Sequence, residues 1–275
     1  MTATVNGTCH HDCPDSCGWT VTVDHSGPAP VAVKLRGNPE HPYSYGELCP
    51  KVNRFLDRVY SPDRVLHPMR RVGPKGSGEF EQISWDDALA EIGSRLAAVI
   101  DEHGGEAVMP FSDAGNQSIL ATEGVSSRFF HHIGATRLLR NICGPTVGAG
   151  VAMTNGSSLG ADALDLEHSK LILLWGTNTK LTNRHLWPVI EKARANGARL
   201  VVIDPIRTLT ADDCDQHIQP LPGTDIAMML AMIHVVIRDD LLDREWVDAH
   251  TLGFDELAES VAEATPAWAA VQCGV

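Results

Sequence analysis

The chain has 275 residues, of which 43% are hydrophobic and 21% are charged, the composition of an ordinary soluble globular protein. This length forms one large or two smaller domains, and no apolar run is long enough for a membrane-spanning helix. Lys and Arg number 22 against 35 Asp and Glu, so the net charge of -13 makes nucleic acid a poor candidate partner. The first residues show neither an apolar leader nor a twin-arginine pair, and the cytoplasm is the expected compartment.

Four of the seven cysteines lie within the first fifty residues. Cys9, Cys13 and Cys17 recur at every fourth position, and Cys49 follows in GELCPK. Three close thiolates and one distant thiolate are what a 4Fe–4S cluster needs. Zinc is the main alternative, although structural zinc sites usually pair their cysteines on two knuckles, and a disulfide framework or buried core thiols fit the pattern less well. We therefore expect a shielded iron–sulfur cluster.

A small β unit is predicted around these cysteines. GWTVTVD and VAVKLRG alternate polar and apolar residues on either side of SGPAP, which predicts a β-hairpin that holds the cluster at its edge. Lys51, two residues after Cys49, is a surface charge on the residues alone, or it bridges the cluster to a neighbouring redox group by hydrogen bonding.

Basic residues are concentrated just after Cys49, in KVNRFLDRVYSPDRVLHPMRR. A local positive surface in an acidic chain suits a phosphate-bearing cofactor, and a solvated face explains the same pattern at least as well. Both interpretations stay open on charge alone.

The pattern then becomes helical over residues 84–104, with Ser84 as N-cap and Gly104 as the stop. The residues expected to face inward are Trp85, Leu89, Ile92, Leu96 and Val99. A stretch rich in Gly, Ser, Thr and Asn follows and contains Cys143 in NICGPTVGAG. Taken alone, Cys143 reads as a buried thiol rather than a ligand or nucleophile.

The clearest architecture is a βαβ unit. KLILLWG and RLVVID are apolar runs that suit parallel strands buried on both faces, and NRHLWPVIEKARANG between them is an amphipathic helix. The loops after the two strands lie at adjacent carboxyl ends, the usual place for a nucleotide. In these loops, Asp204 is placed to accept hydrogen bonds from ribose hydroxyls or a guanine edge, or it only caps the next segment. Arg207 is placed to neutralise a phosphate. No G-x-G-x-x-G follows the first strand, so an ordinary nicotinamide site is not supported.

A further helix is predicted in LPGTDIAMMLAMIHVVIRDDLL. Thr224 or Asp225 at its start caps it or presents a carboxylate to a ligand, and capping is the commoner use. Its expected inward residues are Ile226, Met229, Leu230, Ile233 and Val236 or Ile237.

The order of these pieces resembles the molybdopterin oxidoreductase family, the bis(molybdopterin guanine dinucleotide) group that includes formate dehydrogenases, nitrate reductases and polysulfide or thiosulfate reductases. The cysteine set, CPKVNRFLDRVYSPDRVLHPMRRVG, FEQISWDDAL and LLWGTNTKLTN with ARLVVIDPIRT and LPGTD carry the resemblance over nearly the whole chain. It implies an α/β protein with a small β-rich iron–sulfur domain at residues 1–60. Residues 61–275 would be the N-terminal portion of a doubly wound, mainly parallel, Rossmann-like molybdopterin-binding region, with the family's C-terminal barrel domain missing.

The resemblance also implies roles for particular residues. Lys51 would relay electrons between cluster and pterin, and Cys143 would be the protein ligand of molybdenum. Formate dehydrogenases of the family usually have histidine after that ligand, whereas Gly144 and Pro145 follow here, which argues against formate oxidation. The implied cluster ligands are Cys9, Cys13, Cys17 and Cys49. The implied contacts of one guanine dinucleotide are Gly176, Asn178, Asp204, Arg207, Gly223, Thr224 and Asp225.

The implied protein is a molybdenum-dependent oxidoreductase that moves electrons between a small-molecule substrate and an electron-transfer protein or subunit. Two alternatives remain: a non-molybdenum electron-transfer or structural subunit of the same fold, and a zinc-stabilised nucleotide-binding protein. Because two pterins hold the molybdenum in this family, the 275 residues by themselves are expected to bind the cluster but to hold molybdenum poorly.

Overall fold

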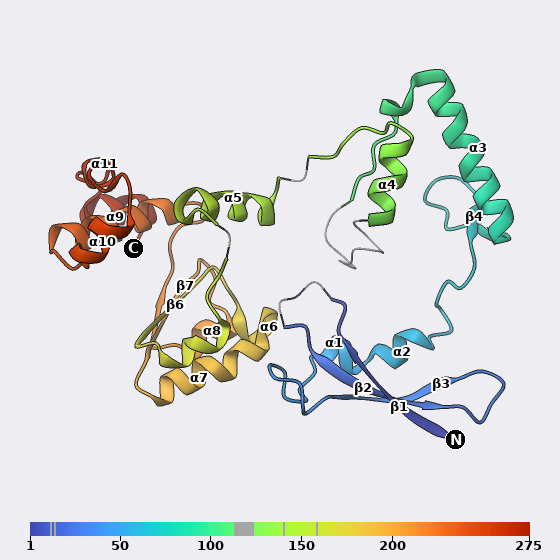
Figure 1. Cartoon of the computed structure of the whole chain (residues 1–275), viewed down its shortest axis with the longest axis horizontal. Helices are drawn as coiled ribbons and strands as arrows, with labels where there is room; N and C mark the ends of the chain where they lie inside the picture. The colour runs from blue at the N-terminus through green and yellow to red at the C-terminus, as the bar shows by residue number, and fades with distance from the viewer. Residues whose placement is uncertain (12, 14, 113–123, 140, 158) are drawn as a thin grey trace. The chain divides into compact units, whose positions relative to one another are not determined.

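A computed structural model of the chain describes residues 1–11, 13, 15–112, 124–139, 141–157 and 159–275 (Figure 1). It contains two compact units, Met1–Gly160 and Ala161–Val275. The first carries a small antiparallel sheet and the second a parallel sheet, so the chain is a mixed α/β protein, as predicted. The expected domain boundary between residues 60 and 61 stays a prediction.

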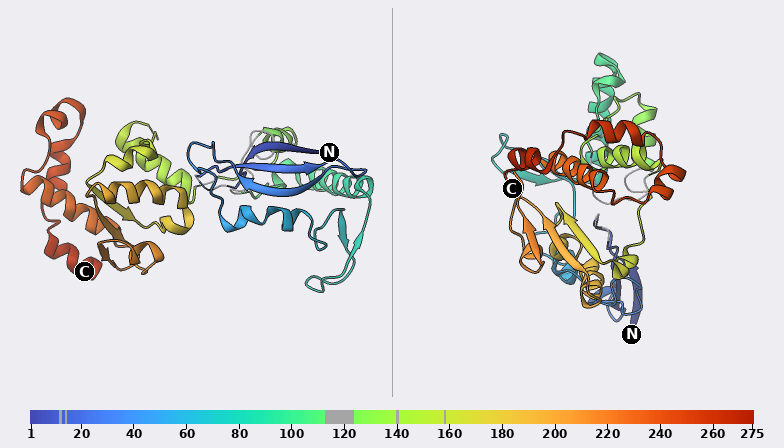
Figure 2. Two further views of the ribbon diagram at one scale, coloured as in Figure 1. Left: turned by 90° about the horizontal axis from the view of Figure 1, so that it is seen from below. Right: turned by 90° about the vertical axis from the view of Figure 1, so that its left-hand side faces the viewer.

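An antiparallel sheet opens the first unit, and its strands run side by side in Figure 2. It has the order β1-β2-β3, formed by β1 (Thr2–Thr8), β2 (Gly18–Asp24) and β3 (Val31–Gly37). The predicted hairpin across SGPAP is confirmed by the pairing of β2 with β3. Strand β1 was not predicted; its only apolar side chains are Ala3 and Val5, and it is largely exposed.

The rest of the first unit is mainly helical. The hairpin of β4 and β5 precedes the long helix α3. The elements are α1 (Pro50–Asn53), α2 (Phe55–Val59), β4 (Met69–Arg71), β5 (Phe80–Gln82), α3 (Trp85–His103), η1 (Gly105–Ala107), α4 (Val125–His132) and α5 (Cys143–Asn155).

Helix α3 begins and ends where the sequence predicted. The Ser84 hydroxyl accepts the Asp87 N–H at 3.0 Å, and Gly104 follows the last turn with a φ of 80°. The expectation of an inward apolar stripe is wrong, because Trp85 is 64% exposed and Leu89 is 61% exposed. Periodicity identifies the apolar face of a helix but does not supply the surface that covers it.

The second unit is built on the predicted βαβ arrangement. Strand β6 pairs in parallel with β7, and β7 pairs in parallel with the short β8, which was not predicted. Its strands are β6 (Leu171–Trp175), β7 (Arg199–Ile203) and β8 (Gln216–Ile218). Its helices are η3 (Ala163–His168), α6 (Thr179–Thr182), η4 (Arg184–Leu186), α7 (Trp187–Ala195), α8 (Leu209–Asp212), α9 (Asp225–Arg238), α10 (Arg244–His250), α11 (Phe254–Ser260) and α12 (Pro266–Cys273).

Strand β7 is buried on both faces of this sheet. Side chains alternate along a strand, so Leu200 and Val202 face α7, while Val201 and Ile203 face α9 and α12. The group on the α7 face contains Ile172, Leu174, Ile190, Ala193, Ala198, Leu200, Val202 and Ala211. The group on the other face contains Val201, Ile203, Met228 and Cys273. Helices on both faces hold the carboxyl ends of β6 and β7 in fixed positions.

The inward face predicted for α9 is wrong. The buried residues are Met228 and Ala231, whereas Ile226 is 71% exposed. Because DIAMMLAMIHVVIR is apolar almost all round, its periodicity does not distinguish one face from another.

Within the described ranges no helix is both long and apolar enough to cross a membrane.

Candidate iron–sulfur centre and nucleotide-binding edge

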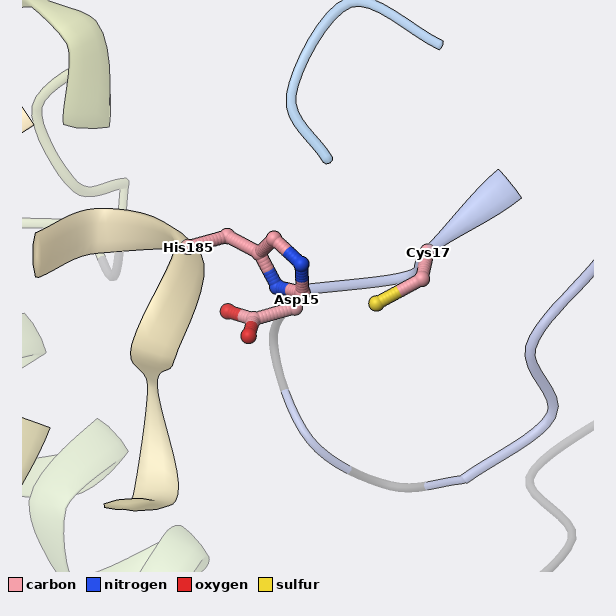
Figure 3. A group of neighbouring side chains, drawn as sticks. All are labelled: Asp15, Cys17 and His185. Atoms are coloured by element: carbon pink, nitrogen blue, oxygen red, sulfur yellow. The ribbon is translucent and has the colours of Figure 1, made fainter. Parts of the chain in front are cut away.

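The loop between β1 and β2 carries three of the predicted ligands. The Cys9 N–H donates to the Cys17 carbonyl at 2.8 Å, which extends the antiparallel ladder one pair beyond Thr8 and Gly18. Cys9 and Cys17 therefore lie opposite each other at the base of the loop, and Cys13 lies within it. Figure 3 shows the Cys17 thiol at the entry to β2 and the side chain of Asp15 on the same loop.

A buried serine ties the Cys49 loop to the start of β2. Ser44 is 2% exposed, and its hydroxyl accepts the Gly18 N–H at 3.3 Å and lies 2.9 Å from His41 Nδ1. The loop also passes so close to β3 that a Cβ on Gly37 would lie 2.0 Å from the Gly46 carbonyl oxygen. Glycine at position 37 therefore permits the close approach that brings the distant part of the ligand set back to the sheet.

Cys49 occupies the N-cap position of α1. Its backbone is extended, and Pro50 begins the helix, where a missing N–H costs nothing. The Asn53 N–H donates to the Cys49 carbonyl at 3.0 Å, and the Asn53 amide donates to the Leu48 carbonyl at 2.9 Å. These bonds fix the backbone on both sides of the thiol.

The structure brings the four predicted cluster ligands together. Cys17 is 3% exposed in a packed group that includes Cys9 and Cys49. Cys13 lies close enough to act electrostatically on both Cys9 and Cys17. None of the four forms a disulfide within the described residues. The residues buried in this group are Cys17, Leu35, Leu48 and Val52, and those packed against them are Cys9, Trp19, Val21, Cys49, Phe55 and Leu56.

Burial dominates the electrostatics of this centre. It raises the pKa of the Cys17 thiol to about 12, and negative charge on Asp15 and the other three cysteines adds to the effect. Burial likewise raises the pKa of Cys9 and takes the pKa of Tyr43 to about 12, the latter with help from Asp15 and the nearby cysteines. Sequence reasoning missed Asp15 and Tyr43; the carboxylate within C-P-D-S-C was the available signal.

The raised pKa of Cys17 predicts a pH dependence of the metal-free chain. The folded state holds the thiol proton up to about 12, whereas the unfolded state releases it near the ordinary value of 9.0. The stabilising contribution is therefore complete below pH 9.0 and is lost as the pH rises towards about 12. We expect urea unfolding to show a steeper loss of stability above pH 9.0 in the native chain than in Cys17→Ala. Equal slopes in the two proteins would contradict this prediction.

The donor set fits an iron–sulfur cluster. Within the described part of the chain, the Trp19 indole N–H is buried without an acceptor, and Trp19 belongs to the packed group that contains Cys9 and Cys17. An unpaired buried donor costs about 1 to 3 kcal/mol, and cluster sulfur offers acceptors. Four cysteine thiols beside an unsatisfied donor are chemistry that suits such a group.

The two other residues expected near the redox centre lie differently. Lys51 is exposed on α1, two residues after Cys49. Cys143 is the first residue of α5, also exposed, with Gly144 and Pro145 in the first helical turn. The packed group that contains Cys9, Cys17 and Cys49 does not include Cys143 among the described residues. Its expected role as a metal ligand stays a prediction.

In the second unit, Gly176 and Asn178 follow β6 and lie at the carboxyl edge of the sheet. Gly176 has a φ of 60°, which favours glycine, and its N–H donates to the Ile203 carbonyl at 2.9 Å. The Asn178 side-chain oxygen accepts the hydroxyl of fully buried Thr210 at 2.8 Å. The Asn178 amide is thereby held in one orientation beside the end of β7.

Asp204 and Arg207 follow β7 and already have partners. One Asp204 carboxylate oxygen accepts the Ile206 N–H at 2.8 Å in a local turn, whereas the next helix, α8, is capped by Thr208, so Asp204 does not cap it. The Arg207 guanidinium donates to Asp212 at 2.7 Å, in an ion pair exposed enough to contribute at most about 1 kcal/mol. A phosphate could therefore replace Asp212 as the partner of Arg207 at small cost.

The turn of Gly223, Thr224 and Asp225 leads into α9, and neither polar side chain caps the helix. Thr224 is the N-cap residue, but its hydroxyl donates to the Leu221 carbonyl at 2.6 Å. Asp225 accepts the Trp175 indole N–H at 2.6 Å. The expectation that capping is the main use of this pair is wrong. The bond instead joins this turn to the end of β6, a contact that sequence reasoning missed.

Comparison with known proteins identifies the family of this α/β iron–sulfur chain. Residues 2–61 match the molybdopterin oxidoreductase Fe4S4 domain, and residues 64–247 match molybdopterin oxidoreductase. The chain belongs to the molybdopterin oxidoreductase family. The resemblance predicted from the sequence is thereby confirmed.

Relatives in this family are much longer than the chain. It is 38% identical over 258 residues to the probable oxidoreductase YoaE of Bacillus subtilis, covering 94% of the chain and 37% of the relative. It is 32% identical to the thiosulfate reductase molybdopterin-containing subunit PhsA of Salmonella typhimurium, and this match covers 88% of the chain and 31% of the relative. Acetylene hydratase from Pelobacter acetylenicus matches in structure with a TM-score of 0.76 and 29% identity, covering 97% of the chain and 37% of that protein. The chain thus spans about a third of the length of the relatives it matches.

Proposed function

We propose that the chain is a portion of a molybdenum-dependent oxidoreductase, binding a 4Fe–4S cluster and part of a bis(molybdopterin guanine dinucleotide) cofactor. The observation that carries this proposal is the packing of Cys9, Cys17 and Cys49 in one group, with Cys13 close enough to affect two of them. Membership of a family whose Fe4S4 domain matches residues 2–61 supports the cluster. The match of residues 64–247 supports the molybdopterin.

The proposed roles follow from donor chemistry. When bound, molybdenum supplies two-electron chemistry on a small substrate, and the cluster exchanges electrons one at a time with a protein partner. The four cysteines hold the cluster, Lys51 donates hydrogen bonds between cluster and pterin, and Cys143 offers a thiolate to molybdenum.

The guanine dinucleotide would bind along the carboxyl edge of β6 and β7. Gly176 gives backbone access, the fixed Asn178 amide offers donors, and Arg207 offers charge to a phosphate. Asp204 and Asp225 each have one carboxylate oxygen engaged within the chain, at Ile206 and Trp175, and the remaining oxygen would accept from the ligand.

The proposal is tested by anaerobic reconstitution of the purified chain with iron and sulfide. We expect about four iron and four sulfide per chain and a broad brown absorbance, because four thiolates complete a cubane cluster. Zinc binding without colour would favour the zinc-stabilised nucleotide-binding alternative. If a cluster assembles but the catalytic rate of the full-length protein is unchanged by Cys143→Ala, the result would favour the non-molybdenum alternative or a misplaced ligand.

The 275 residues by themselves should bind molybdenum weakly, since they span only about a third of the matched relatives. Elemental analysis of the chain, purified from a host that makes the cofactor, is expected to give much less than one molybdenum for each cluster counted from the iron content. Full molybdenum occupancy in the isolated chain would contradict this expectation. Iron content serves as the internal control, because residues 2–61 match the Fe4S4 domain and include all four proposed ligands.

A further inference from the structure

Positive charge is concentrated in one segment of an otherwise acidic chain. Residues 51–75 contain seven basic and two acidic residues, whereas the whole chain has a net charge of -13. Its basic residues are Lys51, Arg54, Arg58, Arg64, Arg70, Arg71 and Lys75. All seven are exposed. We call the first part of this segment, residues 51–66, which includes nearly all of α1, all of α2 and the loop after them, the basic surface.

The basic surface is attached directly to the candidate cluster centre. Helices α1 and α2 pack Val52 and Phe55 into the group that contains the cysteines. The Phe55 ring lies 5.3 Å from His10 and 5.2 Å from His11, which are part of the cysteine loop. The opposite face of the same helices therefore exposes charged side chains to solvent close to the candidate cluster centre. Figure 1 shows both helices beside the antiparallel sheet.

Much of this positive charge is not neutralised within the chain. Arg54 pairs with Asp57, and Arg70 pairs with Glu81 and Glu91. Across the described residues, Arg58 and Arg64 form no ion pair, and the two line a hollow of about 290 Å³. The hollow is completed by Ser61 and Asp63. Two guanidinium groups against one carboxylate leave net positive charge at the hollow, which suits carboxylates presented by a partner.

Apolar side chains are interleaved with these charges. Val65 is 72% exposed, Leu66 is 68% exposed and Tyr60 is half exposed. The Tyr60 hydroxyl accepts the Ala32 N–H at 2.7 Å, which fixes the end of α2 to β3. Arginine and tyrosine beside aliphatic groups are typical of protein interfaces, and the acidic remainder of the chain repels a nucleic acid. The surface therefore favours a protein partner.

We propose that the basic surface is the docking site of an acidic electron-transfer protein. The inference rests on the proposed function, because the partner's reduced centre would pass one electron to the oxidised cluster. The carrier loses that electron and the cluster gains it, with no bond formed or broken. Opposite charge steers the partner to the face behind which the cysteine loop packs.

The test uses the full 275-residue chain, reconstituted with its cluster, and a reduced acidic plant-type 2Fe–2S ferredoxin as the probe. Stopped-flow absorbance should show electron transfer that slows about tenfold when ionic strength rises from about 0.02 M to 0.2 M. At low salt, Arg58→Glu combined with Arg64→Glu should lower the rate about tenfold with cluster absorbance unchanged. The matched control is the double variant Arg238→Glu and Arg244→Glu on α9 and α10, which makes the same change in charge. Its rate should stay within about twofold of the native rate.

Calorimetric binding of ferredoxin to the metal-free chain separates this inference from the proposed function. If no cluster assembles but binding is strong and lost in the Arg58 and Arg64 double variant, the docking site stands and the cluster proposal fails. Rates and binding that are equal in both double variants, or insensitive to salt, overturn the docking site. Tighter binding of a short DNA duplex than of ferredoxin also overturns it, since the surface would then serve nucleic acid.

Discussion

Replacing Cys17 with alanine is expected to lower the iron content of the reconstituted chain from about four per chain to below one. Cys17 is 3% exposed, so neither water nor an added thiol can readily reach its position and substitute for the missing thiolate. The substitution removes one sulfur from a packed group that is also held by Leu35 and Val52, and the fold should survive it. Iron and sulfide analysis with visible absorbance measures the loss, and circular dichroism verifies folding.

Cys214→Ala is the matched control for this substitution. Like Cys17, Cys214 forms no disulfide within the described residues; it is partly buried, and burial also raises the pKa of its thiol. It packs in the second unit against the α7 face of the sheet, so its removal should leave the iron content unchanged. Retention of four iron atoms in Cys17→Ala, or equal loss in both variants, would show that these four thiols do not form the cluster site.

The features that the sequence predicted correctly depend on local patterns. The spacing of Cys9, Cys13 and Cys17 places them in one loop, and the pattern of GWTVTVD and VAVKLRG predicts the hairpin beside it. The two apolar runs and the helix between them predict the parallel pair β6 and β7. Each of these predictions concerns residues near one another along the chain, where periodicity and spacing act directly.

The features that the sequence did not predict depend on contacts between distant residues. Trp175 and Asp225 are fifty positions apart, and nothing local to either one indicates the hydrogen bond between them. Tyr43 is recognisable as part of the cysteine centre only once the Cys49 loop has folded back to β2. The buried faces of α3 and α9 were misassigned for the same reason, since a helix pattern does not name the partner that covers it.

Leu200→Ala is expected to destabilise the second unit by about 3 kcal/mol. Leu200 has no exposed surface in β7 and packs in the group with Ile190 and Val202, so truncation removes buried methyl groups and leaves a cavity. Urea unfolding monitored by tryptophan fluorescence reports the change, because Trp175 and Trp187 both pack on this sheet. A lower urea midpoint with an unchanged dependence of the unfolding free energy on urea would indicate lower stability of an otherwise similar fold.

Leu171→Ala tests whether burial rather than residue type causes this loss. Leu171 pairs with Arg199 at the start of β6 and is 55% exposed, so its truncation should cost less than about 1 kcal/mol. Equal destabilisation by the two substitutions would contradict a β7 core buried on both faces. The difference bears on function because β7 ends at Ile203, next to Asp204, and β6 ends at Trp175, which holds Asp225. A cavity behind β7 should therefore weaken the nucleotide binding proposed for the carboxyl edge, whereas the exposed truncation should leave it intact.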